Sequence, residues 1–280
     1  NPATRIDVKV DRLLRFELTV ADLAAAERFY TALPDVVVVG RGNADPAMAA
    51  LLGVQRIEQV TLRRGEQVVV LQAFDPPGAP YPVGATACDQ HFQHFALPVS
   101  DAVAATAGLP DAATPVSVGG AQKLPPASGS ATAYKFRDPE GHPLEFIQFA
   151  DGHLGGIDHS AIVSSEVERS IAFYRDRLGL TVASRQTNRG PAQDRLDGLT
   201  DTVVEVVALE PCTATPHVEL LAYQSPPVRP DSPLAPNDVA ATRLVLMVDV
   251  VSQPCVTLAD GTAAALIRDP DGHQLLLIGP

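Results

Sequence analysis

The chain has 280 residues, enough for two domains of ordinary size and a substantial buried core. Its 33 acidic and 21 basic residues give a formal net charge of -12, which repels nucleic acid and anionic lipid. No apolar run approaches the roughly 18 residues that a membrane-spanning helix needs. We therefore expect neither nucleic acid nor a membrane as partner. The three cysteines form no CxxC pair, so we expect a reducing, cytoplasmic compartment.

The first predicted element is a half-buried strand that leads into a helix. In RFELTVADLAAAERFY, residues 15–30, Phe16 and Leu18 alternate with Arg15 and Glu17 before a polar turn and a helix that ends in Phe-Tyr. Side chains of a strand alternate between its two faces. We therefore expect the bulky apolar set to pack under the helix and the set that begins at Arg15 to face the concave side.

The same opening returns three times along the chain. It recurs in HFALPVSDAVAATAGL (94–109), HSAIVSSEVERSIAFY (159–174) and RLVLMVDVVSQPC (243–255). The sequence therefore predicts four copies of a strand, helix and three-strand unit, near 13–78, 90–150, 156–224 and 242–280, with the helix of the fourth copy nearly lost. The proline-rich stretches DPPGAPYPVG and SPPVRPDSPLAPND are expected loops within two domains, 1–150 and 151–280.

The second and fourth copies close on related hairpins. FRDPEGHPLEFIQF (136–149) and IRDPDGHQLLLIGP (267–280) agree through the turn, but Glu145 in the first meets Leu276 in the second. The turn histidines, His142 and His273, are expected to be exposed. Glu145 and, in the third copy, Glu219 fall on inner strand faces, where an unpaired carboxylate is costly to bury.

One unit cannot close a core alone, so the units should pair. We predict an α+β fold in which four βαβββ modules pair into two incomplete β-barrels. A cupped sheet with few polar groups is by default a ligand site, here for a small-molecule substrate.

These motifs resemble the vicinal oxygen chelate superfamily, which includes glyoxalase I, extradiol dioxygenases, methylmalonyl-CoA epimerase, and bleomycin and fosfomycin resistance proteins. The most specific elements are YRDRLGLTV (174–182) and the DPEGHPLEF hairpin. In that family the first and last strands of each module supply the metal ligands. The resemblance places these positions, copy by copy, at Arg15 and Val70, His94 and Glu145, His159 and Glu219, and Arg243 and Leu276.

Two pairings of the copies are open. If copies one and two shared a barrel, neither half of the protein would collect a good ligand set. If copies two and three pair, one site gathers His94, Glu145, His159 and Glu219 without a partner subunit, and we favour this arrangement. The other site would then hold Arg15 and Arg243, either as filler paired with Glu17 or as an anion pocket.

Two imidazoles and two carboxylates suit a divalent Zn, Ni, Co, Fe or Mn ion. A lone strand histidine is more often a plain core or surface residue, and the coincidence of four donors at equivalent positions favours a metal site.

The resemblance implies that Glu145 leaves the metal and shuttles a proton, and we expect its affinity for a proton to rise in an apolar pocket. His217 is either a supporting residue or a strand-end histidine, and the polar loop 187–201 is either a lid or only a loop.

Three function classes stay open. A metal-dependent lyase, isomerase or epimerase of the glyoxalase type is favoured, because a fourth ligand, Glu219, is present. An extradiol (catechol) dioxygenase is the alternative; the resemblance implies that such members use two histidines and one carboxylate, drawn from the other pairing of the copies. A drug- or metabolite-binding resistance protein would need no metal ligands.

Overall fold

The computed structural model describes residues 8–280, and strands dominate it. Copy one contains β1 (Val10–Thr19), α1 (Leu23–Thr31), β2 (Val36–Asn43), α2 (Pro46–Leu51), β3 (Arg56–Arg64) and β4 (Gln67–Asp75). Copy two contains β5 (Gln93–Pro98), α3 (Ala102–Ala107), β6 (Thr114–Pro115), β7 (Gln122–Lys123), the 3₁₀ turn η1 (Pro126–Ser128), β8 (Thr132–Arg137) and β9 (Pro143–Gln148).

The second half repeats this order. Copy three contains β10 (His159–Val163), α4 (Val167–Ala172), the π-helical turn η2 (Phe173–Arg177), β11 (Thr181–Arg189), α5 (Pro191–Asp197), β12 (Val203–Glu210) and β13 (His217–Ser225). Copy four contains β14 (Arg243–Val248), β15 (Val256–Thr257), β16 (Ala263–Arg268) and β17 (Gln274–Gly279), and no helix lies between β14 and β15. The predicted four-fold repeat and the shortened last copy are confirmed. Within residues 8–280, no helix has both the length and the apolar character needed to cross a membrane.

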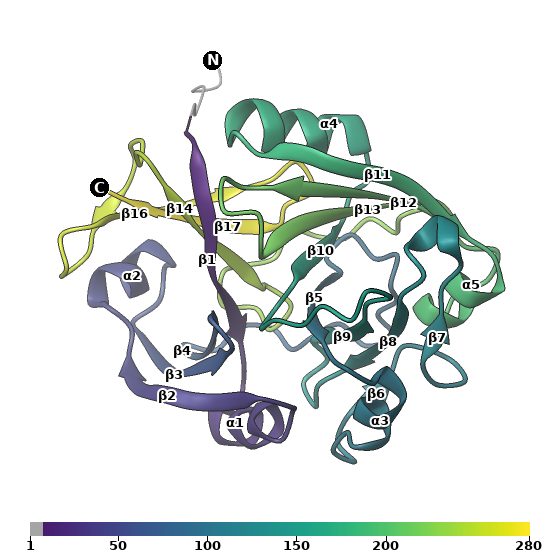
Figure 1. The fold of residues 1–280 in the computed structure, drawn as a ribbon. Coiled ribbons are helices and arrows are strands. Elements are labelled where there is room, and N and C mark those ends of the chain that lie inside the picture. The colour runs from purple at the N-terminus through teal and green to yellow at the C-terminus, as the bar shows by residue number, and fades with distance from the viewer. Residues whose placement is uncertain (1–7) are drawn as a thin grey trace.

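The strands form two sheets, each built from two copies. One sheet has the order β15-β16-β17-β14-β1-β4-β3-β2, and the other has the order β11-β12-β13-β10-β5-β9-β8-β6. Copy one therefore joins copy four through the antiparallel pair β1–β14, and copy two joins copy three through β10–β5. The sheets curve without closing into barrels and lie side by side in Figure 1. The predicted fold class and the favoured pairing are confirmed.

Each sheet takes strands from both halves of the chain, so the two halves are interlocked. The division into domains 1–150 and 151–280 stays a prediction.

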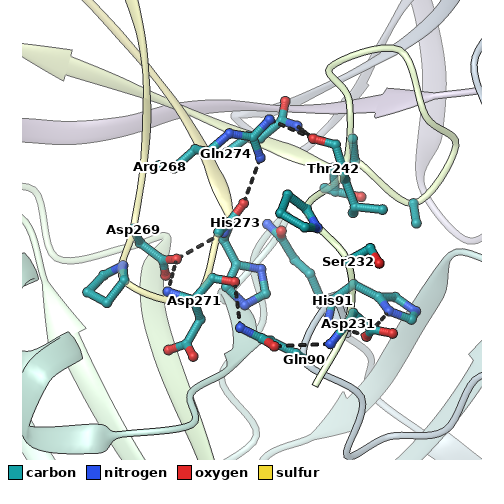
Figure 2. Close-up of a pocket in the computed structure, with 17 residues that line it drawn as sticks. Gln90, His91, Asp231, Ser232, Thr242, Arg268, Asp269, Asp271, His273 and Gln274 are labelled. Atoms are coloured by element: carbon teal, nitrogen blue, oxygen red, sulfur yellow. Dashed lines mark hydrogen bonds and ion pairs between the residues drawn. The ribbon is translucent and has the colours of Figure 1, made fainter. Parts of the chain in front are cut away.

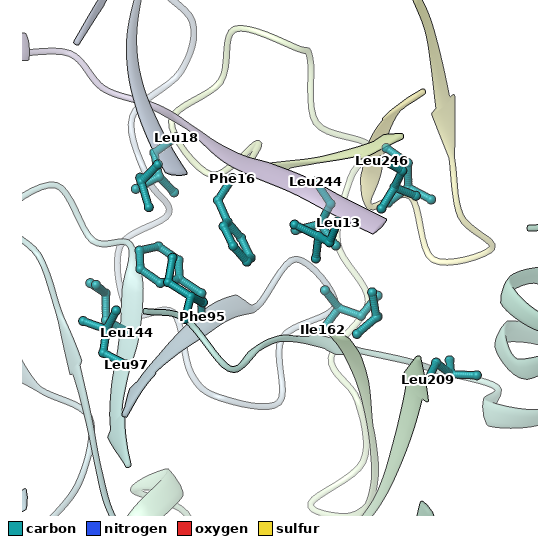
Figure 3. Close-up of a cluster of buried hydrophobic side chains, with 14 of the residues drawn as sticks. Leu13, Phe16, Leu18, Phe95, Leu97, Leu144, Ile162, Leu209, Leu244 and Leu246 are labelled. Atoms are coloured by element: carbon teal, nitrogen blue, oxygen red, sulfur yellow. The ribbon is translucent and has the colours of Figure 1, made fainter. Parts of the chain in front are cut away.

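The core between the sheets comes from the apolar side chains of the first strand of each copy. Phe16 of β1 and Phe95 of β5 lie with ring centroids 5.4 Å apart, and Ile162 and Leu244 belong to the same buried cluster (Figure 3). That cluster also contains Phe29 of α1, so the apolar face packs against both the helix and the opposite sheet.

The Phe-Tyr helix ends and the hairpin turns fasten consecutive copies together. The hydroxyl of Tyr30, in copy one, donates to Asp138 Oδ2 in the turn of copy two at 2.9 Å. In the second half, Tyr174 donates to Asp269 Oδ2 at 3.0 Å. The repeated motifs are therefore docking elements between copies one and two and between copies three and four.

The expectation that the turn histidines are exposed is wrong. His142 is 1% exposed and His273 is 7% exposed. His142 Nδ1 lies 2.7 Å from Asp138 Oδ2, and its Nε2 lies 2.9 Å from the carbonyl oxygen of Val239. His273 Nε2 lies 2.8 Å from the carbonyl oxygen of Val163. These imidazoles are buried because each connects its turn to a neighbouring chain segment.

Replacing Tyr30 with phenylalanine is expected to lower the free energy of unfolding by about 1.5 to 3 kcal/mol, because it removes a buried hydrogen bond to a charged carboxylate. Tyr134→Phe is the matched control, since the Tyr134 hydroxyl makes no hydrogen bond within residues 8–280. Chemical denaturation of the two variants measures the difference. Equal unfolding free energies would show that the hydroxyl does not fasten the copies.

Candidate metal centre

The four predicted ligands meet on four adjacent strands. His94 lies on β5, Glu145 on β9, His159 on β10 and Glu219 on β13, which follow one another in the order β13-β10-β5-β9. The register explains the meeting, because β10 pairs Ala161 with Glu219 and β5 pairs Ala96 with Glu145. Residues two apart on a strand share a face, so both histidines point to the same side as both glutamates.

Glu145 lies between the two imidazoles. Its Oε2 is 3.0 Å from His94 Nε2 and 3.6 Å from His159 Nε2. Glu219 Oε2 is 3.5 Å from His159 Nε2 on the other side. Three of the residues, His94, Glu145 and His159, are buried and offer donor atoms within 4.8 Å of one another. The donor types and their spacing fit a divalent ion, with Glu219 at the edge of the group.

Asp158 and His217 support this group from the side of β10 and β13. Asp158 Oδ2 accepts from His159 Nδ1 at 2.8 Å, which leaves Nε2 of the same ring facing the two glutamates. His217 Nε2 lies 3.3 Å from Glu219 Oε1. Of the two sequence-based alternatives for His217, the contact with Glu219 favours the supporting role. Asp158 is not among the residues predicted from the sequence, although it directly precedes His159.

The electrostatics keep the carboxylates ionised. Burial raises the pKa of Glu145, but His159, His94 and Lys135 outweigh it and hold the pKa well below its usual value. Burial lowers the pKa of His94, and Glu145 opposes this only in part. Burial also disfavours the charged form of His159, yet Glu219, Asp158 and Glu145 raise its pKa well above its usual value. The metal-free centre therefore holds a neutral His94 and a protonated His159 between carboxylates.

Metal uptake near neutral pH is expected to release a proton, because a ligating imidazole must be neutral. A raised pKa of His159 stabilises the metal-free fold below about pH 6.5, and this contribution is lost as the pH rises through the higher folded value. Metal affinity should therefore increase with pH across that window. Calorimetric titration in buffers of different protonation enthalpy counts the protons. A count of zero at pH 7 would contradict the raised pKa.

Replacing Asp158 with asparagine is expected to weaken metal binding by about 10- to 100-fold, the usual cost of losing the partner that orients a ligating histidine. Asp151→Asn is the matched control, because Asp151 pairs with His153 and not with His159. Competition with a chromogenic chelator measures both affinities. Equal affinities would show that Asp158 does not orient the ligand.

A cavity of about 190 Å³ opens beside these residues. Its lining includes the four predicted ligands and an apolar part formed by Leu124, Ile147, Leu196 and Val206. Helix α5 and the end of β11 form one wall with Gln193 and Asn188, so the loop 187–201 contributes to the cavity. The plain-loop alternative is wrong, because the segment contains the end of β11 and the helix α5 (Pro191–Asp197), and the lid stays a prediction.

Lys135 of β8 also lines the cavity, and the sequence analysis missed it. The side chain is 4% exposed, and its Nζ donates to Asp197 Oδ1 at 2.6 Å. Burial disfavours the charged form, but Asp197, Glu145 and Glu219 raise the pKa of Lys135. The β8–β9 register places Lys135 opposite Glu145, so counting residues across the hairpin would have identified it.

The corresponding place in the other sheet is filled. Arg243 is fully buried, and its guanidinium donates to Glu17 Oε2 at 3.3 Å and to Gln72 Oε1 at 2.8 Å. Arg15 pairs with the same Glu17 at 2.9 Å. Leu276 packs in an apolar cluster nearby. Of the two alternatives for this site, the geometry favours the one in which Arg15 and Arg243 fill the space and pair with Glu17, rather than an anion pocket.

A larger hollow of about 290 Å³ lies between the 231–242 segment and the last hairpin (Figure 2). Several of its polar groups are already engaged. Gln90 Nε2 donates to the carbonyl of Asp271 at 3.1 Å, and Nδ1 of His91 pairs with Asp231. Within residues 8–280, both close groups of three or more metal-binding side chains lie at the other cavity.

Comparison with solved structures places the fold among known ones. Glyoxalase I from Zea mays aligns with a TM-score of 0.64 at 15% identity, over 96% of this chain and 92% of that chain. A candidate dioxygenase from Bacillus subtilis aligns with a TM-score of 0.59 at 10% identity, over 97% and 86% of the two chains. At these identities the likeness shows the fold alone. Comparison with curated proteins gives no match.

The family comparison covers most of the chain. The model of the Glyoxalase/Bleomycin resistance protein/Dioxygenase superfamily matches residues 12–146 and again residues 156–277. The two matches correspond to copies one and two and to copies three and four. The resemblance that the motifs suggested is therefore confirmed, and this chain belongs to the Glyoxalase/Bleomycin resistance protein/Dioxygenase superfamily.

Proposed function

We propose that the protein is a metal-dependent enzyme of the glyoxalase type, a lyase, isomerase or epimerase that acts on a small substrate with two neighbouring oxygens. His94, Glu145, His159 and Glu219 would hold a divalent Zn, Ni, Co, Fe or Mn ion. The observation that carries the proposal is the convergence of these four donors from adjacent strands, with Glu145 between the two imidazoles. Four inward donors count against a resistance protein that only sequesters its ligand.

The bound ion would act as a Lewis acid toward the two substrate oxygens. The protein contributes the geometry, because the donors stand on paired strands rather than on loops. One chain supplies both modules of the site, so no partner subunit is needed to complete it. We expect the enzyme to work in the cytoplasm.

Glu145 is the proposed proton shuttle. Its lowered pKa keeps it ionised at neutral pH, which is the form that accepts a proton. Its carboxylate would take a proton from the carbon beside a substrate carbonyl and return it to the neighbouring position. The structure has Lys135, His94 and His159 around Glu145, so in this conformation the pKa is lowered and the surroundings are not the apolar pocket that the sequence suggested.

One observation favours a second candidate, an extradiol dioxygenase. The tightest group, His94, Glu145 and His159, is a set of two histidines and one carboxylate, with Glu219 outside it. Non-haem iron oxygenases use this ligand type. The two candidates differ in whether Glu219 is a ligand and whether dioxygen is consumed.

Metal analysis of protein purified without chelator, followed by a screen of hemithioacetals, acyl-CoA thioesters and catechols, separates the candidates. We expect one divalent ion per chain and turnover without dioxygen. Dioxygen consumption with a catechol would assign the second candidate. Protein that binds no divalent ion would contradict both.

A further inference from the structure

Lys135 is a buried cation to which the proton shuttle assigns no contact with the substrate. It faces the cavity from β8, directly opposite Glu145. An ammonium group has three N–H donors. Within residues 8–280, Nζ makes one hydrogen bond, to Asp197. Two donors are therefore free for a ligand in the cavity.

The internal repeat shows that an inward glutamate at this position, here the partly exposed Glu219, is not always paired with a lysine. The residues opposite the equivalent position in the other copies are Thr61 opposite Val70, Ala208 opposite Glu219, and Leu266 opposite Leu276. Glu219 is thus held with an alanine across the strand pair. His94 and His159 also contact Glu145, so Lys135 is one of three basic groups beside it, and its ammonium can also serve a ligand.

Stability alone is a poor explanation for this lysine. A buried ion pair is often no more stabilising than apolar residues of similar volume, because both charges lose their hydration. At the equivalent position of copy four the same chain has apolar residues instead, because Leu266 lies opposite Leu276 and packs in the same cluster. The Lys135–Asp197 pair instead keeps a charge at the wall of a cavity that contains the predicted ligands.

Gln193 adds an acceptor to the same wall. Its Nε2 donates to Asp197 Oδ2 at 2.7 Å, which fixes the orientation of the amide because a carboxylate accepts only from the N–H side. Gln193 Oε1 is buried and has no hydrogen-bond partner within the described residues. An unpaired buried acceptor is unfavourable, and an O–H or N–H group of a ligand would satisfy it.

The cavity limits the size of such a ligand. Its volume of about 190 Å³ is below the roughly 300 to 1,000 Å³ of pockets for drug-sized molecules. The protein's net charge of -12 disfavours anions in general, so a preference for an anion would come from local cations, which here are the proposed metal ion and Lys135. Lys135 is the lysine that lines this cavity.

We propose that Lys135, anchored by Asp197, binds an anionic oxygen of the substrate, so that the site takes small carboxylic acids whose carboxylate lies next to the two chelating oxygens. Gln193 accepts a hydrogen bond from a hydroxyl or N–H group of the same molecule. This inference rests on the proposed function, because it assumes that the substrate is chelated beside Lys135.

Two hydroxamates test the inference. Acetohydroxamate and malonohydroxamate chelate a divalent ion through the same pair of oxygens, and only the second carries a carboxylate. Calorimetry gives the ratio of their dissociation constants for zinc-loaded wild-type protein and variants. Comparing ratios between variants cancels the intrinsic difference between the probes. We expect the preference for malonohydroxamate to fall about tenfold in Lys135→Met, the loss of one hydrogen bond to a charged group.

Lys135→Met leaves Asp197 buried and unpaired, so the double variant Lys135→Met/Asp197→Asn removes both charges and keeps the volumes similar. Lys123→Met is the control, because Lys123 is exposed and lies outside the cavity lining. It should keep the wild-type ratio. An unchanged ratio in a zinc-loaded double variant would overturn this inference alone. Failure of the wild type to bind zinc would overturn the proposed function and this inference together.

Discussion

Protein in which His159 is replaced with alanine should lose its divalent ion during purification. The imidazole supplies one of four ligands, and it lies between Glu145 and Glu219, at 3.6 and 3.5 Å. Losing such a ligand removes a direct metal bond and takes the imidazole from between two carboxylates. We expect metal affinity to fall by roughly three orders of magnitude, which equals about 4 kcal/mol.

His153→Ala is the control for this experiment. His153 is half-exposed, stacks on Phe149 and pairs with Asp151, and its Nε2 lies 3.8 Å from Asp158 Oδ1, beyond hydrogen-bond distance, so it belongs to the rim rather than to the ligand set. Metal content by plasma emission spectroscopy should be one per chain in the control and near zero in His159→Ala. Stoichiometric metal in both variants would refute the ligand assignment.

Glu145→Gln should retain metal and substrate binding while turnover falls by about 10²- to 10⁴-fold, the usual contribution of general acid–base catalysis. The amide has the volume of the carboxylate and an oxygen that can still reach the metal, but it cannot take a proton. Glu219→Gln is the comparison, because both residues occupy equivalent places in copies two and three. It should weaken metal binding more than it slows turnover of the loaded enzyme.

The measurement is single-turnover kinetics at saturating metal and substrate, with the substrate found by the screen described above. Full activity of Glu145→Gln would remove Glu145 from the proton-transfer role, whereas dioxygen consumption with a catechol would assign the dioxygenase alternative.

The repeat and the pairing of copies could be predicted from sequence for a physical reason. The alternation in the first strands, such as Phe16 and Leu18 against Arg15 and Glu17, fixes which face is apolar. The distribution of His94, Glu145, His159 and Glu219 over only the middle copies then favours one pairing, and the sheet order confirms it.

Features that depend on contacts between copies could not be predicted in the same way. The burial of His142 comes from Asp138 and from the backbone of Val239, which lies far along the chain. Asp197, the partner of Lys135, lies in helix α5, in a segment that the sequence suggested to be either a lid or a plain polar loop. These interactions depend on packing of distant segments, and strand periodicity carries no information about them.

The central claim is that copies two and three share one metal centre, and anomalous diffraction from crystals of zinc-loaded protein tests it most directly. We expect a single strong peak about 2.1 Å from a nitrogen of His94 and from a nitrogen of His159, with Glu145 and Glu219 completing the coordination. A peak at Asp158 and His217 without His94, or no ordered zinc at the cavity, would contradict it.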